Sequence, residues 1–385
     1  MSCKNGLLPS SLKTVPLTGE TWLTLYLPPL LFYYGMAAMV TLKDTRKYRV
    51  ALLPIGLVLA ARVILFLDLA EGDPAMEIKN SGPTILMGAI ILRIVGWALE
   101  PGQLVRTSKL EQRGDRARTT GEILWDAAEL CFNQRGVGWN WGNSKQSFAP
   151  AVSRWQGAKN GLVDFVRYAP VFEAIMLLHT VRYRTNVMNE HVERIAEVFM
   201  FAGFAYAHSC AHYGLAQAFA VGVIGQDARE WTPLFDAPWK ARSLTELWGR
   251  RWHKYTRDFC TRTFGELFAS IFGRPGFVFG TFLISGIWHD LGTWGANRRT
   301  GICCFWTPFF VMNGVGVSME ECWYKVTGRR VGGLPGLLWL VSWNLLWGIS
   351  TYEGRCMEAF LHGNETMSHL LLVTNTVRLI KPYIS

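Results

Sequence analysis

The chain has 385 residues, of which 50% are hydrophobic and only 18% are charged, and its formal net charge is +10 at pH 7. A soluble protein of this length normally carries more charge and shorter apolar runs, so the soluble class is excluded. The positive charge lies between apolar blocks, where membrane topology explains it, and no nucleic-acid-binding module is present. We therefore predict an all-α, polytopic transmembrane bundle that contacts membrane lipids and no nucleic acid.

Residues 1–20 contain two prolines and predict a loose tail without a cleaved signal peptide, followed by a single membrane-embedded domain over residues 21–385. Apolar blocks that approach the ~20 residues of a bilayer span predict about eight spans. They lie at about 21–42, 50–69, 83–100, 162–181, 195–224, 264–291, 303–324 and 334–353. The fifth and sixth blocks are too long for one straight span. Pro275 and Gly276 divide the sixth, so it is either kinked or a span joined to a re-entrant piece.

Two polar stretches, at about 101–160 and 226–262, carry nine and eight Lys/Arg residues respectively. The positive-inside rule predicts that both face the cytosol and that both termini face the lumen. The glycosylation sequon Asn364–Thr366 falls on the predicted lumenal side. Within the first stretch, the run Arg135–Gly142 (RGVGWNWG) predicts Trp139 and Trp141 at headgroup level.

His289 lies in the sixth apolar block, and a titratable imidazole at membrane depth costs free energy and marks a functional site by default. A neutral imidazole can take a proton from a hydroxyl as that oxygen attacks a carbonyl carbon. The alternative is a buried histidine with one backbone partner. Ser285, Trp288 and Asp290 flank it in the apolar span, which favours function. Asp290 either orients His289 or lies at the lumenal water boundary.

A second cluster, Leu247–His253 (LWGRRWH), stands on the second basic stretch. Arg250 and Arg251 are candidates to bind the phosphates of a cytosolic donor, because guanidinium groups match phosphate in a bidentate manner. His253 is a candidate to orient a substrate or to stabilise a developing oxyanion. The alternative is a basic interfacial helix that contacts anionic lipid headgroups.

His208 and His212 are four residues apart in the fifth block, a spacing that can bind a metal on one helical face. The chain has only eight histidines and no second clustered pair, so we expect no metal. The eight cysteines show no CxxC pair and are interpreted as small hydrophobic residues.

The runs Leu247–His253 (LWGRRWH) and Phe282–Asp290 (FLISGIWHD) together resemble the wax-synthase-like branch of the membrane-bound O-acyltransferases. The run Arg135–Gly142 is similar to one in fungal members that acetylate terpenoids and meroterpenoids. The resemblance covers roughly residues 130–350. It implies that His289 is the catalytic histidine and that His253 occupies a second active-site position that is often Asn. It also implies acetyl-CoA as co-substrate, with no bound cofactor, and a tunnel from a cytosolic donor site to a membrane-side acceptor site.

We therefore expect an enzyme of the endoplasmic reticulum membrane that acetylates a hydroxyl of a lipophilic, terpenoid-type secondary metabolite. The catalytic residues are predicted to be His289 and His253. The predicted substrate-binding residues are Trp252, Arg250, Arg251, Ser285, Trp288 and Asp290. One alternative is long-chain wax-ester synthesis. Another is a transporter or lipid-binding membrane protein, which the lack of an internal repeat disfavours. The acceptor alcohol and the oligomeric state are left open.

Overall fold

A computed structural model describes residues 13–107, 116–133, 135–141, 149–185, 189–254, 257, 260–296, 298 and 304–352. The chain forms two compact units. The first comprises Met1–Gln146 and His253–Arg330, and the second comprises Ser147–Trp252 and Val331–Ser385. The first twelve residues of the predicted tail, the sequon and parts of both basic stretches lie outside the described residues.

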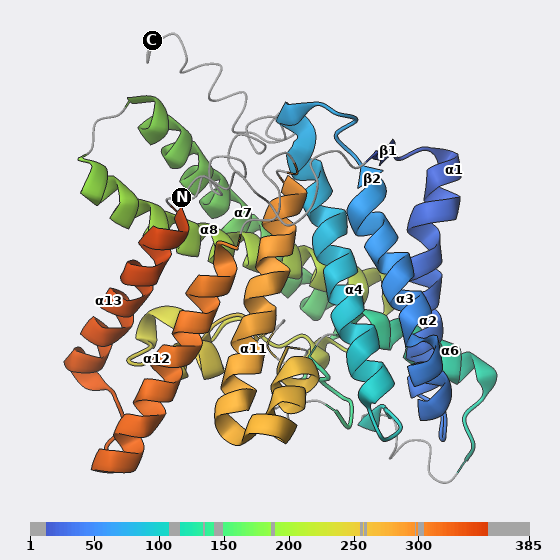
Figure 1. Ribbon diagram of the computed structural model, residues 1–385. Helices are drawn as coiled ribbons and strands as arrows, with labels where there is room; N and C mark the ends of the chain where they lie inside the picture. Colours follow the sequence, from blue (N-terminus) through green and yellow to red (C-terminus); the bar gives the residue numbers. More distant parts are fainter. Residues whose placement is uncertain are drawn as a thin grey trace. The chain divides into compact units, whose positions relative to one another are not determined.

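The structure is mostly helical, as predicted (Figure 1). Within the described residues, four segments are long and apolar enough to cross a membrane: Gly19–Val40, Arg46–Phe66, Met76–Leu99 and Thr261–Ala296. They coincide with the first, second, third and sixth predicted spans. The other four predicted blocks are also helices, but the count of eight spans is not confirmed. Charged residues spread along α7 (Arg154–Thr185) and the first turns of α8 (Glu190–Phe219) dilute their apolar character.

The first unit contains helices and two short β-strands. They are β1 (Val15–Pro16), α1 (Gly19–Thr21), η1 (Trp22–Tyr26), α2 (Leu27–Val40), α3 (Arg46–Phe66), β2 (Leu67–Asp68), η2 (Pro74–Asn80), α4 (Ser81–Leu99), α6 (Thr120–Phe132), η8 (Thr261–Gly265), α11 (Glu266–Ala296) and α12 (Trp306–Thr327). The two short strands pair in parallel, Val15 with Leu67 and Pro16 with Asp68.

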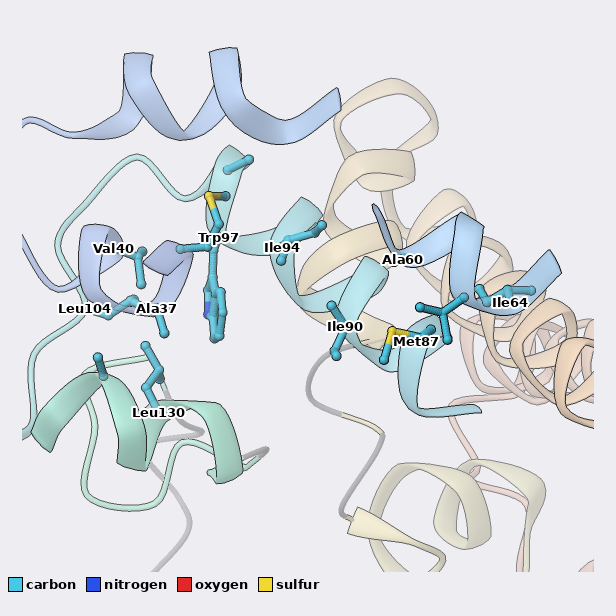
Figure 2. Packing of buried hydrophobic residues seen from close by; sticks show 14 of the residues in the cluster. Ala37, Val40, Ala60, Ile64, Met87, Ile90, Ile94, Trp97, Leu104 and Leu130 are labelled. Atoms are coloured by element: carbon cyan, nitrogen blue, oxygen red, sulfur yellow. The ribbon is translucent and has the colours of Figure 1, made fainter. Parts of the chain in front are cut away.

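The core of the first unit lies where α2, α3, α4 and α6 meet (Figure 2). Ala37, Ala60, Met87 and Leu130 come one from each of these helices, and none has any measurable exposure. Small alanines allow the helices to approach, and methionine and leucine fill the space between them. This packed set of helices is the support against which α11 lies.

The sixth apolar block reverses direction near its start and then continues as one long helix, and whether its short arm enters a membrane stays a prediction. Its reversal is at Gly273, whose φ of 63° and ψ of −149° break the helix. The two helical arms on either side of Gly273 run antiparallel and very close together. The approach is so close that an added Cβ on Gly276 would lie 2.4 Å from the Phe268 carbonyl oxygen. A Cβ on Gly280 would lie 2.6 Å from the carbonyl oxygen of Phe264. Glycine at these positions therefore permits the hairpin visible at one end of α11 in Figure 1.

Replacing Gly273 with valine should prevent the hairpin from forming, because a positive φ with an extended ψ is essentially restricted to glycine and costs other residues roughly 1–3 kcal/mol. We expect a lower melting temperature in detergent and a smaller monodisperse fraction on size-exclusion chromatography. Gly82→Ala is the matched control, since an added Cβ at Gly82 meets nothing within 4 Å. A Gly273→Val protein as stable as this control would contradict the role of the reversal.

Arg93, an intramembrane arginine of α4, is buried and binds the end of a neighbouring helix. Its guanidinium donates to the carbonyl oxygens of Leu130 and Asn133 at the C-terminus of α6. It also lies over the rings of Trp97 and Trp141, with centroid distances of 4.7 and 5.2 Å. A cation at a helix C-terminus satisfies the last carbonyls and the helix dipole. The contacts of Arg93 are thus structural.

The prediction that Trp139 and Trp141 lie at headgroup level is wrong. Both are at least 94% buried, and both pack in the hydrophobic core of the first unit. The reason is a loop whose residues pair with an earlier part of the chain. The Asn140 side chain accepts from the N–H of residue 105 and donates to the carbonyl oxygen of residue 103, and Trp139 forms an antiparallel β-bridge with Arg106. An indole ring suits a membrane surface and a protein core equally well, so composition alone did not separate the two.

The second unit is built on the pair α7 and α8. Its other elements are η4 (Ala220–Ile224), η5 (Ala228–Glu230), η6 (Pro238–Lys240), α9 (Leu244–Glu246), η7 (Leu247–Arg251) and α13 (Gly333–Tyr352). Gly161 of α7 and Gly214 of α8 face each other so closely that a Cβ on Gly161 would lie 2.5 Å from the Gly214 carbonyl oxygen. This is the small-residue contact through which membrane helices commonly approach.

Candidate active site

The two predicted histidines both belong to the first unit and interact with each other. The hairpin of α11 separates them in the chain, with His253 before it and His289 after it, and Phe264 lies opposite Gly280 across the hairpin. Their electrostatic interaction is direct, since charge on His289 lowers the pKa of His253. Residues 36 positions apart in sequence are thereby brought together.

The orientation of the His289 ring is set by its own helix. Nδ1 lies 2.7 Å from the carbonyl oxygen of Ser285, one turn earlier. A carbonyl oxygen can only accept, so Nδ1 carries the proton and Nε2 is the unprotonated nitrogen of the neutral ring. The half-buried imidazole is therefore held in the tautomer whose Nε2 can accept a proton from a substrate.

Three aromatic rings surround His289. Phe310 of α12 is tilted against it, with ring centroids 4.7 Å apart and planes inclined at 38°. Trp306, one turn earlier on α12, and Trp288 of α11 have centroid distances of 5.8 and 5.5 Å. These rings restrict the imidazole and lower its contact with water. Sequence reasoning missed Trp306 and Phe310, because their four-residue spacing in an apolar helix is ordinary core spacing.

His253 has an unusual backbone and a perturbed acidity. Its φ of 37° lies in the left-handed region, which non-glycine residues adopt rarely and at a cost. Burial lowers the pKa of His253 to about 4, and the charge of His289 acts in the same direction. His253 is therefore neutral at pH 7, and a neutral imidazole can donate one hydrogen bond to a developing oxyanion.

The lowered pKa of His253 predicts acid sensitivity. Between pH 6.5 and about 4 the unfolded chain binds a proton at this residue and the folded chain does not, so stability falls as the pH falls through this window. We expect the melting temperature of the wild type to decrease more steeply from pH 7 to 4.5 than that of His253→Asn. Parallel curves for the two proteins in a thermal-shift assay would contradict this assignment.

Trp288 and Ser285 both contribute contacts within the protein. The Trp288 indole N–H donates to the carbonyl oxygen of Ile85 at 3.0 Å, and its ring packs where a Cβ on Gly88 would lie. Trp288 thus joins α11 to α4. Ser285 acts on His289 through its backbone carbonyl, and its half-buried side chain is one turn from the imidazole.

Asp290 is 3% exposed and binds the first turn of α12. Its Oδ1 accepts from the backbone N–H groups of Phe305 and Trp306, at 2.8 and 2.7 Å. Its Oδ2 accepts from the N–H and the hydroxyl of Thr307, at 3.0 and 2.6 Å. Both carboxylate oxygens therefore bind protein donors. Asp290 of α11 thus binds the start of the neighbouring helix α12, a contact that the sequence did not indicate.

Arg250, Arg251 and Trp252 belong to the second unit. Arg251 is buried, and its guanidinium bonds Glu246 at 2.8 Å and the carbonyl oxygen of Asp236 at 2.8 Å. The Arg250 side chain is 60% exposed and pairs with Glu246 at 3.2 Å. Surface ion pairs are weak and exchange readily, whereas a buried arginine with satisfied donors does not. Arg250 is therefore better placed than Arg251 to meet an external phosphate.

Trp252 immediately precedes His253 and packs in an aromatic group of the second unit. Its ring meets Phe235 edge-on, with a centroid distance of 5.1 Å, and lies 6.3 Å from Trp248. This packing anchors the chain directly before the left-handed turn at His253.

His208 and His212 are in contact in α8, with ring centroids 4.1 Å apart and planes inclined at 35°. Nδ1 of His212 donates to the carbonyl oxygen of His208 at 2.9 Å, and Phe172 of α7 lies beside both rings. The pair therefore forms part of the aromatic contact between α7 and α8.

Residues 231–312 match the model of the membrane bound O-acyl transferase family. This segment contains both candidate histidines and the start of α12. The predicted resemblance to the membrane-bound O-acyltransferases is confirmed. The matched segment also spans the hairpin of α11, so the family match falls on the part of the chain that forms the candidate site.

Named relatives come from fungi and plants. The chain is 25% identical to an acetyltransferase of Humicola fuscoatra, over 42% of this chain and 43% of that protein. It is 25% identical to an O-mevalon transferase of Aspergillus niger, over 59% and 60% of the two chains. It is 33% identical to a protein of Arabidopsis thaliana named "Probable long-chain-alcohol O-fatty-acyltransferase 9", over 23% of this chain and 28% of that protein. The chain thus spans less than two thirds of the length of each of these relatives.

Proposed function

We propose that this chain is a membrane O-acyltransferase that moves an acetyl group from acetyl-CoA to a hydroxyl of a lipophilic secondary metabolite, of terpenoid class. The single observation that carries the proposal is the His289 imidazole, which presents an unprotonated Nε2 next to a neutral His253. Residues 21–385 would act as one acyltransferase domain with about eight spans in the endoplasmic reticulum. The fungal acetyltransferase relative supports the acyl group assigned.

The proposed reaction needs no covalent enzyme intermediate, because a thioester is already activated. His289 Nε2 takes the hydroxyl proton as the hydroxyl oxygen forms a bond to the thioester carbonyl carbon. The N–H of His253 stabilises the resulting oxyanion. The C–S bond then breaks, and the imidazolium of His289 returns its proton to the departing CoA sulfur. General base catalysis of this kind contributes on the order of 10²–10⁴-fold.

The other residues predicted from the sequence bind the donor or support the two histidines in the proposed reaction. Arg250 binds a phosphate of CoA, and Trp252 supports the turn at His253. Trp288 and Ser285 hold His289 in place from the same helix. Arg251 stabilises the segment that carries Arg250, through Glu246.

The rival activity is long-chain wax-ester synthesis, which the match to the plant relative supports. Microsomes containing the protein are supplied with labelled acetyl-CoA or palmitoyl-CoA, each with a terpenoid alcohol or a fatty alcohol. Acetyl transfer to the terpenoid alcohol is the expected result, and microsomes from cells without the gene are the control. Palmitoyl transfer to the fatty alcohol alone would replace the proposal with the rival, and no transfer in any combination would refute both.

A further inference from the structure

The N-terminus of α12 is capped by a residue that belongs to another helix. The first N–H groups of a helix have no partner within it, and a side chain of the preceding residue usually accepts from them. Here Phe305 directly precedes α12 and makes no side-chain cap. Asp290 of α11, fifteen residues earlier, supplies the acceptor oxygens to three successive N–H groups, those of Phe305, Trp306 and Thr307.

This cap is stronger than an ordinary one for two physical reasons. A carboxylate at a helix N-terminus is stabilised by the helix dipole as well as by its hydrogen bonds. Asp290 is buried in the segment Thr261–Ala296, so water does not replace the lost bonds if the carboxylate is removed. Asp290 therefore helps to fix the position of the first turn of α12 relative to α11.

The first two turns of α12 also carry the rings that contact His289, Trp306 in the first turn and Phe310 one turn later. Phe310 and Trp306 contact the imidazole directly. The Trp306 indole N–H further donates to the Thr293 hydroxyl at 2.9 Å, and that hydroxyl donates to the His289 carbonyl oxygen at 3.1 Å. Consequently His289 and its neighbour Asp290 bind the same turn, one through its ring and the other through its carboxylate.

We propose that Asp290 is a positioning residue, which clamps the first turn of α12 so that Trp306 and Phe310 hold the His289 imidazole in its reactive orientation. The proposal rests on the proposed function of His289. Asp290 itself touches no substrate, and it acts on catalysis through α12. Removal of the Asp290 carboxylate should therefore lower kcat with little change in substrate affinity.

The key variant is Asp290→Asn, which keeps the shape of the side chain. Its Oδ1 can still accept from Phe305 and Trp306, but an amide NH₂ in place of Oδ2 faces the N–H of Thr307. We expect kcat to fall by roughly 10–100-fold, as for a small misplacement of a catalytic group. The KM for acetyl-CoA should change less than about threefold. Thr307→Val removes only the hydroxyl donor and should cause a smaller loss.

A matched control separates positioning from general destabilisation. Thr119→Ala removes the N-cap of α6 in the same unit, where the Thr119 hydroxyl accepts from the Glu122 N–H. It should lower the melting temperature with unchanged kcat per folded molecule. If Asp290→Asn lowers kcat no more than this control does, the proposal is overturned.

A double-mutant cycle tests whether Asp290 acts through the aromatic wall. Phe310→Leu keeps an apolar side chain but removes the ring next to His289. If Asp290 acts through α12, Asp290→Asn should reduce kcat by a much smaller factor in the Phe310→Leu background. Equal factors in both backgrounds would overturn the proposal, since a merely structural residue acts independently of Phe310.

A readout without acyl transfer distinguishes failure of this inference from failure of the proposed function. Diethyl pyrocarbonate modifies unprotonated imidazole, and mass spectrometry gives its rate at His289 relative to the exposed His191. We expect Asp290→Asn to raise this ratio several-fold, because the ring loses its aromatic cover. An unchanged ratio overturns the positioning role even in an active enzyme. A raised ratio in a protein without any transferase activity supports the clamp and refutes the function.

Discussion

Replacing His289 with alanine should abolish acetyl transfer while the protein still inserts into the membrane and folds. The side chains of Trp288, Trp306 and Phe310 that surround His289 cannot act as a general base in its place, so kcat should fall by at least ~10²–10⁴-fold. Transfer is measured with labelled acetyl-CoA on purified protein, at equal amounts of folded enzyme. The ring packs against Phe310 and Trp306, and its removal leaves a cavity that costs some stability.

The control for this cost is His289→Gln, which fills more of the space and preserves a hydrogen-bond donor near Ser285. Both variants should be equally inactive, although the glutamine variant should have the higher melting temperature. Turnover near the wild-type level by either variant would refute the assignment of His289 as the base.

Replacing His253 with alanine should also cause a large loss, whereas asparagine should retain part of the activity. The proposed role of His253 is to donate a hydrogen bond to the oxyanion, and an asparagine amide N–H can donate in a similar way. Loss of one such donor typically costs about 10²–10³-fold in kcat. Asparagine also tolerates the left-handed backbone that residue 253 adopts, and alanine tolerates it less well.

The two histidines are distinguished by comparing the variants under one set of conditions. Activity in His253→Asn together with inactivity in His289→Ala supports the roles assigned above. If His253→Asn is inactive and His289→Ala is active, the roles of base and hydrogen-bond donor must be exchanged.

The membrane class could be predicted from the sequence, and the two histidines could be singled out as candidates, because both leave a local signal. An apolar block of about 20 residues has one physical explanation, and an imidazole inside it is costly enough to need a reason. The division of the sixth block at Pro275 and Gly276 was equally local. The actual reversal falls at Gly273, two residues earlier, because only its backbone takes the required positive φ.

The sequence failed where a side chain suits two environments. Trp139 and Trp141 were assigned to the membrane surface, yet they lie in the protein core, because the loop that carries them is hydrogen-bonded to residues 103–106. In each case the residue type permits both outcomes, and contacts with residues distant in sequence decide between them.

Hydropathy along the chain was enough to predict a helical membrane protein and to single out His289 and His253 as candidates for its chemistry, since hydrophobic length and the cost of a buried imidazole depend only on local composition. Tertiary structure alone decided how those histidines meet, which nitrogen of His289 is unprotonated, and that Asp290 binds α12. The physical reason is that hydrogen bonds and ring contacts depend on the register between helices. That register follows from glycine contacts and a single backbone reversal that hydropathy does not encode.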